Sequence, residues 1–360
     1  MSVVHVTASR CYDVLINEVS LDSLGKVCQT TANPDAVFVV SDSNVAPLYL
    51  DRARHSLTEA GFGEEIPAFV FAAGEQSKTM ETLSACLEAM ASAGLTRSSV
   101  VVALGGGVVG DLAGFAAASY MRGCHCIQVP TSLLACVDSS VGGKTAVDLA
   151  AGKNLAGAFF QPDAVLIDTS LLSTLPEHFF IDGCAEAIKY GVIRDETLFE
   201  KFEHPLSLDD SRLGDIVTRC VEIKRDVVQE DERESGMRML LNFGHTLGHA
   251  IERESGYTIT HGFAVACGMV LVSRAAAKRG MCDLTLPKHL SSLFSAYGLP
   301  ITTSFSPEQL YDAACSDKKR RGSHIDVVIA QHIGKASVHS FDLSEFKAFV
   351  RDACDEFDCQ

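Results

Sequence analysis

Short apolar runs alternate with helix-like stretches in the first half of the chain. The strand-like runs are 36–40, 67–71, 99–104, 126–129 and 164–167, and helical patterns cover 79–93 and 109–120. These strands are apolar throughout rather than on alternate residues, which indicates that both faces of their sheet are covered. The pattern therefore predicts an α/β domain built on a parallel sheet with helices on both sides.

The pattern changes after Leu175-Pro176, where helical periodicity dominates. Helices are predicted over 178–192, 212–230, 237–255, 262–279, 286–297 and 307–316. A short hairpin is predicted from 326–329 and 335–338, joined around Gly334. The sequence thus predicts an N-terminal α/β domain over 1–176 and a helical domain over 177–360. Ligand sites commonly lie in a cleft between such domains.

A glycine-rich turn follows the strand at 99–104. Gly105-x-Gly107-x-x-Gly110 leaves a strand and opens a helix, the context in which backbone N–H groups receive a pyrophosphate. The acid usually found about 20 residues later is absent, because the next strand ends in Pro130-Thr131-Ser132. A tight strand–helix turn without a ligand remains the alternative.

Two further polar loops follow strands of the same sheet. Asp42 and Asn44 come directly after 36–40, where a carboxylate can hold a ribose hydroxyl. Gly74-Glu75-Gln76-Ser77-Lys78 follows 67–71. Each loop alone could be an ordinary turn, but three polar loops at strand ends of one sheet favour a nucleotide site.

Three histidines follow one another at metal-ligand spacing. His245 and His249 are four residues apart and share a helix face, and His261 begins the next predicted helix. Imidazole groups on a helix–turn–helix suit zinc. A structural histidine pair is the alternative, and the third histidine favours the metal.

Glu186 stands in an otherwise apolar helical stretch, DGCAEAIKY. A buried carboxylate is costly without a cation nearby, so we expect either a metal or an ion pair with Lys189.

The overall charge excludes two classes of partner. The chain has 46 acidic and 30 basic residues, for a formal net charge of −16. That charge disfavours nucleic acid and anionic membrane surfaces. No apolar run approaches the roughly 18 residues of a membrane helix, and the start, MSVVHVTASR, lacks a signal-peptide pattern. The 13 cysteines form no C-x-x-C pair, which favours a reducing, cytoplasmic setting.

Several cations nevertheless stand among small or apolar residues. They are Arg122, Lys144, Lys153, Lys189, Lys224, Arg238 and the Lys318-Lys319 pair. Each alone could be a solvated surface residue, but together they predict a pocket for phosphate and carboxylate groups.

Long stretches of the chain resemble the 3-dehydroquinate synthase family, within the sugar phosphate cyclases. They are GGGVVGDLAGFAAASYMRG (105–123), VPTSLLACVDSSVGGKTAVDLAAGKNLAGAFFQP (129–162), AEAIKYG (185–191), LNFGHTLGHAIE (241–252) and HGFAVACGM (261–269). The resemblance implies a Rossmann-like NAD-binding α/β domain followed by an all-α metal-binding domain, in a homodimer.

The resemblance also implies a role for individual residues. The metal, Zn²⁺ or Co²⁺, falls to Glu186, His245 and His261, and His249 becomes a catalytic group on the substrate side. NAD contacts fall on Asp42, Asn44, Glu75, Lys78, Gly106, Gly107, Val108, Asp111, Thr131, Ser132, Lys144, Lys153, Leu171 and Thr174. The substrate pocket falls on Arg122, supplied by the partner subunit, and on Asp138, Lys144, Asn154, Lys189, Lys224, Arg238, Asn242 and Lys319 or its neighbour Lys318.

The implied reaction converts 3-deoxy-D-arabino-heptulosonate 7-phosphate to 3-dehydroquinate and phosphate, in the shikimate pathway to chorismate and the aromatic amino acids. The alternatives are a cyclase for another sugar phosphate, of the 2-deoxy-scyllo-inosose or valiolone type, a metal-dependent polyol dehydrogenase, and a non-catalytic relative. One departure keeps the last of these open. The family reads His-Gly-Glu after the helix break, and this chain reads His261-Gly262-Phe263. The missing carboxylate is not a ligand, but its loss could alter the groups that orient His261.

Overall fold

The structure is a computed structural model that describes residues 2–17, 20–234, 236–316, 320–321 and 324–355, with backbone only at 320–321. The chain divides into two compact units. Unit 1 comprises Met1–Pro176 and Ser211–Arg233, and unit 2 comprises Glu177–Asp210 and Glu234–Gln360.

The return of 211–233 to unit 1 was not foreseen in the predicted domains, 1–176 and 177–360. Helix α7 (Leu213–Glu230) packs against strand β1. At its C-terminal end, Gln229 accepts a hydrogen bond from the Thr7 backbone, and Glu232 accepts one from Ser9. These contacts tie the segment to the first strands of the chain and explain its place in unit 1.

A seven-stranded sheet forms the centre of unit 1, in the order β1-β2-β9-β6-β5-β3-β4. Its strands are β1 (Ser2–Thr7), β2 (Cys11–Ile16), β3 (Val37–Asp42), β4 (Ala68–Phe71), β5 (Val100–Gly105), β6 (His125–Pro130) and β9 (Ala164–Ile167). All neighbours pair in parallel except β1, which is antiparallel to β2. The parallel strands are those that the apolar runs predicted, with β2 added.

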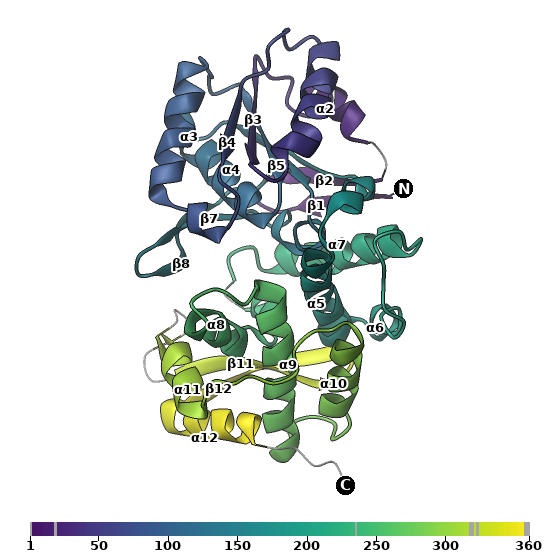
Figure 1. The fold of residues 1–360 in the computed structure, drawn as a ribbon, viewed down its shortest axis with the longest axis vertical. Coiled ribbons are helices and arrows are strands. Elements are labelled where there is room, and N and C mark those ends of the chain that lie inside the picture. Colours follow the sequence, from purple (N-terminus) through teal and green to yellow (C-terminus); the bar gives the residue numbers. More distant parts are fainter. Residues whose placement is uncertain (1, 18–19, 235, 317–319, 322–323, 356–360) are drawn as a thin grey trace. The chain divides into compact units, whose positions relative to one another are not determined.

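Successive residues of one strand face two different cores. On β3, Val37 and Val39 join the core under α1 (Leu24–Thr31) and α2 (Ala46–Glu59). Phe38 and Val40 join the other core, under α3 (Met80–Ser92) and α4 (Gly107–Ser119). Figure 1 shows α2, α3 and α4 around β3, β4 and β5. Because helices bury both faces of the sheet, the strands show no alternation of apolar and polar residues and are continuous apolar runs in the sequence.

The chain reverses its direction of travel across the sheet between β3 and β5. It runs outward from β3 to β4, then returns to β5 and continues through β6 to β9 on the other side. At such a switch point the loops after neighbouring strands separate, and ligands of open α/β sheets bind at the carboxyl ends there.

A separate hairpin, β7 (Lys144–Leu149) and β8 (Gly152–Phe159), follows the π-helical turn Ala135–Ser139. The sequence patterns missed it, because its central residues are mostly small and carry little apolar alternation.

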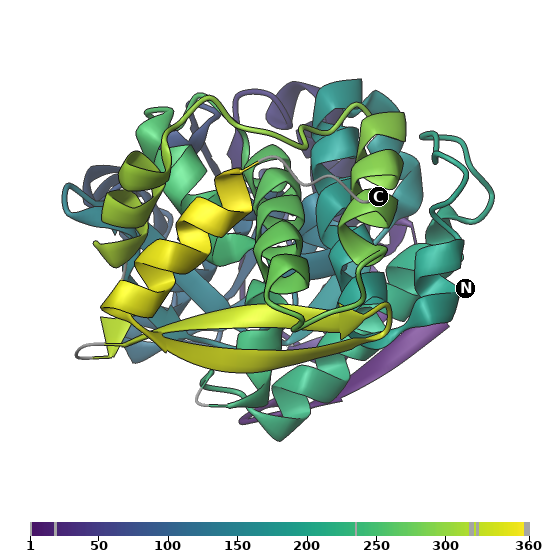
Figure 2. The same cartoon turned by 90° about the horizontal axis from the view of Figure 1, so that it is seen from below.

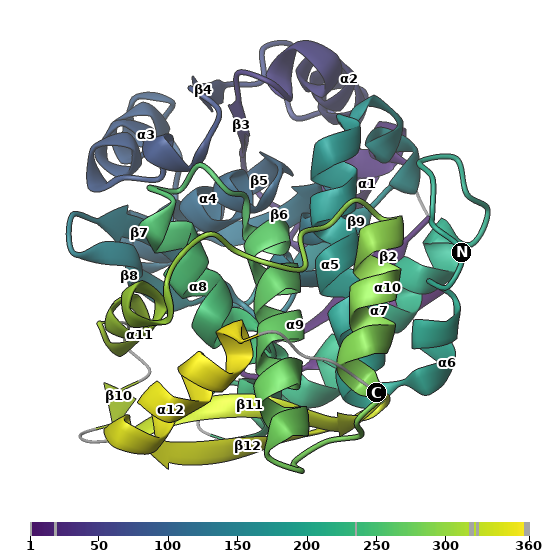
Figure 3. The ribbon, with the colours of Figure 1, turned by 60° about the horizontal axis from the view of Figure 1, so that its bottom comes forward.

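Unit 2 is mainly helical. Its helices are α5 (Glu177–Arg194), α6 (Glu196–Glu200), α8 (His245–Glu254), α9 (His261–Lys278), α10 (Leu286–Ala296), α11 (Pro307–Cys315) and α12 (Leu343–Cys354). Strands β10 (Arg320–Arg321), β11 (His324–His332) and β12 (Lys335–Asp342) form a small antiparallel sheet. Figure 2 shows α12, in yellow, running obliquely beside the yellow strands of this sheet, and Figure 3 shows α9 between α8 and α10. The predicted fold class is confirmed, and the strands of this unit are the expected hairpin, β11 and β12, and the two-residue strand β10.

One predicted helix was wrong in its extent. The stretch 237–255 contains a 3-10 helix, Met237–Asn242, and then α8 from His245. Gly244 separates them with a φ of +79°, a left-handed conformation suited to glycine. A side chain there would also collide with Met269 of α9. The break lets α8 approach α9 closely.

Helices α5 and α9 approach each other closely at Gly262, which has no side chain. A Cβ atom at Gly262 would overlap the carbonyl oxygen of Asp182, one turn before Glu186 on α5. The Asp182 carboxylate in turn accepts a hydrogen bond from the Phe263 backbone N–H at the start of α9.

None of the helices formed by the described residues has both the length and the apolar character needed to cross a bilayer.

We expect Gly262→Ala to lower the free energy of unfolding of the protein by about 3 kcal/mol, because the added methyl group overlaps backbone that cannot move aside. Gly280→Ala is the control at the other end of α9: space is open there, and only its φ of +67° opposes alanine, at about 1 kcal/mol. Urea unfolding of both variants measures the difference. Equal losses would contradict the close crossing of α5 and α9.

Candidate functional site

A carboxylate and two imidazoles of unit 2 come together from three helices. Glu186 lies on α5, His245 is the first residue of α8, and His261 is the first residue of α9. Oε1 of Glu186 lies 3.5 Å from Nε2 of His245 and 3.5 Å from Nε2 of His261. Separations near 3.5 Å are those of ligand atoms around one tetrahedral zinc ion, whose bonds are about 2 Å long. The donor set therefore fits a metal such as zinc or cobalt.

Hydrogen bonds at the other ring nitrogen orient both imidazoles. Nδ1 of His245 lies 3.1 Å from the Phe243 carbonyl oxygen, and Nδ1 of His261 lies 3.2 Å from Oε2 of Glu252. A proton held at Nδ1 by such an acceptor leaves the Nε2 lone pair directed at a metal. Glu252 is itself buried, so its carboxylate has a fixed direction.

The field in this cluster favours a cation. Burial alone would lower the pKa of His261, but the carboxylates of Glu252 and Glu186 outweigh it and raise that pKa well above its ordinary value. The second oxygen of Glu186 accepts a hydrogen bond from Lys189, which is 1% exposed. Glu186 thus forms the expected pair with Lys189 and also faces the two histidines, the arrangement that a metal site at Glu186 would need.

His249 lies one turn after His245 on the same face of α8, as its spacing predicted, with ring centroids 5.4 Å apart. It can form a second group with Glu252 and His261. Glu252 already serves as the hydrogen-bond acceptor of His261 in that group, which makes the Glu186 group the better metal site. His249 is partly exposed beside it.

Phe263 does not replace an orienting group of His261. Glu252 fills that position, and residue 263 contributes its backbone N–H to Asp182. The departure from the family pattern therefore leaves the cluster intact.

Polar side chains of unit 1 collect at the carboxyl ends of its parallel strands. Asp42 ends β3 and accepts hydrogen bonds from the backbone N–H groups of Asn44 and Val45. The predicted glycine turn ends β5, with Gly106 capping α4 and Gly107 as its first residue. Because β3 and β5 flank the switch point, Asp42 and this turn both lie at the position where open α/β sheets usually bind their ligands. Thr131 and Ser132 follow β6, and Leu171 and Thr174 follow β9 in the turn Thr169–Thr174.

Two glycines of this turn differ in the room that they leave for a side chain: a Cβ atom would be tightly placed at Gly107 but would make only an ordinary contact at Gly106. A Cβ atom on Gly107 would lie 3.0 Å from Oγ of Ser139, and one on Gly106 would lie 3.4 Å from Oγ of Ser132. The first N–H groups of α4, including that of Val108, have no acceptor within the helix and are suited to receive an anion. The strand order, the turn and the helix together fit a dinucleotide.

Lys78 is the buried cation of this region. Its ammonium group donates to Oδ2 of Asp111 on α4 and, at 2.6 Å, to Oδ1 of Asn154 on β8. Burial opposes its charge, but Asp111 and Glu75 raise the pKa of Lys78 overall. Glu75 also lies 3.6 Å from Lys153. The predicted NAD positions Glu75, Lys78, Asp111 and Lys153 thus join one charge network.

Predicted substrate residues occur in both units. In unit 1, Lys224 of α7 donates to Oδ1 of Asp138 at 2.9 Å and to the Asp138 carbonyl, while Lys144 is exposed at the start of β7. In unit 2, Arg238 is buried in the 3-10 helix, and Asn242 donates to Glu234 at 2.7 Å. Lys318 and Lys319 lie outside the described residues.

Arg122 is far from the glycine turn of its own chain. It ends the exposed turn Tyr120–Arg122 that follows α4, about 20 Å along that helix. Met121 and Arg122 both have positive φ, +48° and +68°.

Sequence reasoning missed two supporting carboxylates, Glu252 and Asp182. Glu252 is seven residues after His245, a spacing that returns to the same helix face, and this could have indicated its role. Asp182 had no such signal, because its contact with α9 depends on how two helices cross.

The fold and the two sites define a class of protein that combines a doubly wound α/β unit with a helical unit carrying a glutamate–histidine–histidine cluster. Solved structures of sugar phosphate cyclases share its fold. A 2-deoxy-scyllo-inosose synthase complexed with carbaglucose-6-phosphate, NAD⁺ and Co²⁺ superimposes with a TM-score of 0.84 at 26% identity, covering 98% of this chain and 100% of that one. A 2-epi-5-epi-valiolone synthase from Streptomyces hygroscopicus subsp. jinggangensis, with NAD⁺ and Zn²⁺ bound, gives 0.85 at 25% identity, covering 97% and 98%.

Sequence comparison is more specific. The family model for the 3-dehydroquinate synthase N-terminal region matches residues 68–182, and the model for its C-terminal region matches 183–320. The curated 3-dehydroquinate synthase of Streptococcus sanguinis is 44% identical over 345 residues, covering 94% of this chain and 97% of that protein. The chain belongs to the 3-dehydroquinate synthase family.

We expect Glu252→Gln to weaken zinc binding by about 10- to 100-fold, since a neutral amide holds the Nδ1 proton of His261 less firmly than a carboxylate does. Competition with a chromophoric chelator measures the affinity without any assay of activity. Glu254→Gln, a partly exposed glutamate of the same helix, is the control and should leave the affinity unchanged. Equal affinities for both variants would remove Glu252 from the site.

Proposed function

We propose that the protein is a 3-dehydroquinate synthase, which converts 3-deoxy-D-arabino-heptulosonate 7-phosphate to 3-dehydroquinate and phosphate. The observation that carries the proposal is 44% identity to a curated enzyme of that name over nearly the whole of both chains. Cyclases with other named products are similar at only 25–26%. The reaction belongs to the shikimate pathway to chorismate and the aromatic amino acids.

The metal and the dinucleotide have separate places in this proposal. Glu186, His245 and His261 would hold Zn²⁺ or Co²⁺, and the strand-end loops of unit 1 would hold NAD. When bound, the metal acts as a Lewis acid on substrate oxygens, and NAD takes and returns a hydride, so that no net NADH forms. Asp42 and Asn44 suit the ribose hydroxyls, and the N-terminus of α4 suits the pyrophosphate.

The remaining polar residues bind and orient the substrate. Its carboxylate and phosphate call for cations, and Lys144, Lys189, Lys224, Arg238 and Lys319 meet this need in a protein of net charge −16. Asn154 and Asn242 supply amide groups for the hydroxyls.

Two further groups are suited to moving protons. His249 stands beside the metal cluster with its ring partly exposed, and Asp138 is held by Lys224. Both are within the repertoire of general acids and bases.

The enzyme is proposed to be a cytoplasmic homodimer in which Arg122 reaches the substrate of the partner subunit. Its exposed position on a strained turn, remote from its own glycine turn, supports this use. The absence of a disulfide among the described cysteines is compatible with a reducing compartment.

Phosphate release from the heptulosonate phosphate tests the proposal. We expect release that requires NAD and is abolished by a chelator, and that is restored by added Zn²⁺ or Co²⁺, with no accumulation of NADH. Release from glucose 6-phosphate instead would favour an inosose-type cyclase. Net formation of NADH from a polyol would favour a dehydrogenase, and inactivity with both NAD and metal bound would indicate a non-catalytic relative.

We expect His249→Ala to keep its metal and lose its rate, because Glu186, His245 and His261 form the cluster without it. The expected fall in kcat is about 100-fold or more, the usual contribution of one general acid–base group. Metal content by elemental analysis is the second measurement, with His261→Ala as the comparison that should lose zinc. Loss of zinc from His249→Ala would make His249 a ligand.

A further inference from the structure

Asp148 occupies an irregular position in the β7–β8 hairpin of unit 1. Regular pairing joins Val147 to Ala156 and Leu149 to Gly152, so that Asp148 alone faces the three residues 153–155 of the opposite strand. A bulge of this kind redirects side chains and is common beside functional sites.

Asn154 lies at the centre of this bulge in a left-handed conformation, with φ of +54°. Asparagine adopts that conformation more readily than most residues, but the conformation still has a higher free energy than the right-handed one. Oδ1 of Asp148 accepts a hydrogen bond of 2.8 Å from the Asn154 backbone N–H. The carboxylate therefore holds the backbone of Asn154 in the conformation that directs its side chain.

The Asn154 side chain continues the network. Its Oδ1 accepts from Lys78 at 2.6 Å, and Lys78 also donates to Asp111 on α4. Asp148 contacts the same loop through its backbone, since its N–H donates to the Lys78 carbonyl oxygen at 2.7 Å. One residue thus positions Asn154 from one side and the Lys78 loop from the other.

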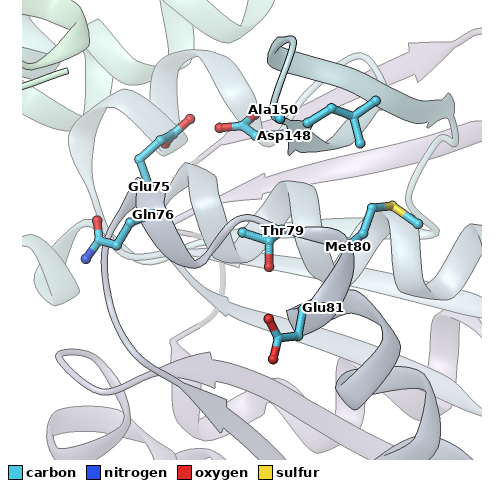
Figure 4. Close-up of a pocket in the computed structure, with 8 residues that line it drawn as sticks. Glu75, Gln76, Thr79, Met80, Glu81, Asp148 and Ala150 are labelled. Atoms are coloured by element: carbon cyan, nitrogen blue, oxygen red, sulfur yellow. The ribbon is translucent and has the colours of Figure 1, made fainter. Parts of the chain in front are cut away.

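A pocket of about 440 Å³ adjoins this network at Asp148 and is lined by Glu75, Gln76, Thr79, Met80, Glu81, Asp148, Leu149 and Ala150. Figure 4 shows the carboxylates of Glu75 and Asp148 pointing toward one another from the two sides. Lys78 and Lys153 supply the positive charge near both. Asp148 is therefore reachable by solvent, and a substitution there need not disturb the core.

We propose that Asp148 is a positioning residue of the reaction: its hydrogen bond to the Asn154 backbone holds the Asn154 amide for the substrate. The role rests on the proposed function, in which Asn154 contacts the substrate. Asp148 makes no contact with substrate in this proposal and acts through Asn154.

The test compares Asp148→Ala, Asp148→Asn and Asp148→Ser in the full-length protein with NAD and zinc. We expect Asp148→Ala to lower kcat/KM for the heptulosonate phosphate about tenfold, the effect of losing one hydrogen bond. Asp148→Asn keeps an oxygen acceptor and should stay within about threefold of wild type. The serine hydroxyl is one bond too short, so Asp148→Ser should resemble alanine and serves where the alanine variant does not fold.

Two readouts separate positioning from general damage. The dissociation constant of NAD should change less than about threefold, because Lys78 keeps its bond to Asp111. The double variant Asp148→Ala with Asn154→Ala should be no slower than Asn154→Ala alone, since Asp148 acts through that residue. Glu81→Ala removes a different carboxylate of the same pocket and should leave kcat/KM unchanged.

Wild-type kcat/KM in Asp148→Ala and Asp148→Ser would overturn the proposal, as would an additive loss in the double variant. A loss in Asp148→Asn equal to that in Asp148→Ala would also overturn it, because charge rather than the hydrogen bond would then be responsible. A wild-type protein with no activity on the heptulosonate phosphate would instead contradict the proposed function.

Discussion

The crossing of α5 and α9 at Gly262 determines where the metal cluster can form. Glycine allows the start of α9 to touch the Asp182 carbonyl, and Glu186 lies one helical turn further along α5. His261, the residue before Gly262, therefore lies next to the Glu186 carboxylate. The Asp182 carboxylate holds the same helix end through the Phe263 backbone. A change in this crossing would move His261 away from Glu186 even if neither residue were substituted.

In unit 1 the strand order plays the same organising part. Placing β3 beside β5 brings Asp42 and the glycine turn to the same switch point of the sheet, although some 60 residues separate them in the sequence. The β7–β8 hairpin adds Asn154 and Asp148 to the charge network around Lys78. Neither the strand order nor the position of a helix end predicts these two residues. The two sites thus depend on backbone arrangement first and on side-chain chemistry second.

How much could be foreseen follows from these same constraints. The parallel strands were predictable because burial of both faces leaves uninterrupted apolar runs, and His261 at a helix start followed from the break at 256–260. Gly244 was not recognised as a break, because its neighbours keep helical periodicity on either side. The resemblance assigned Glu186 and moved His249 out of the ligand set; spacing alone could not, since His245 and His249 share a helix face. Asp182 and α7's place in unit 1 depend on contacts between distant segments, and Asp148 depends on an irregular pairing within one hairpin; the pattern of apolar residues records neither.

The buried lysines provide local positive charge for an anionic substrate in a protein that is acidic overall. Lys78, Lys189 and Lys224 are each held by a carboxylate, which offsets the cost of removing an ammonium group from water. Glu186 has two tasks among these, because it pairs with Lys189 and also faces two histidines. Glu252, in contact with His261, supplies a second negative charge, and a bound divalent metal together with Lys189 would still exceed the charge of these two carboxylates by one, in a region of low dielectric. A phosphate or carboxylate of the substrate would supply the missing negative charge. The overall charge of −16 is therefore no obstacle to binding an anion, since the local balance at Glu186 decides it.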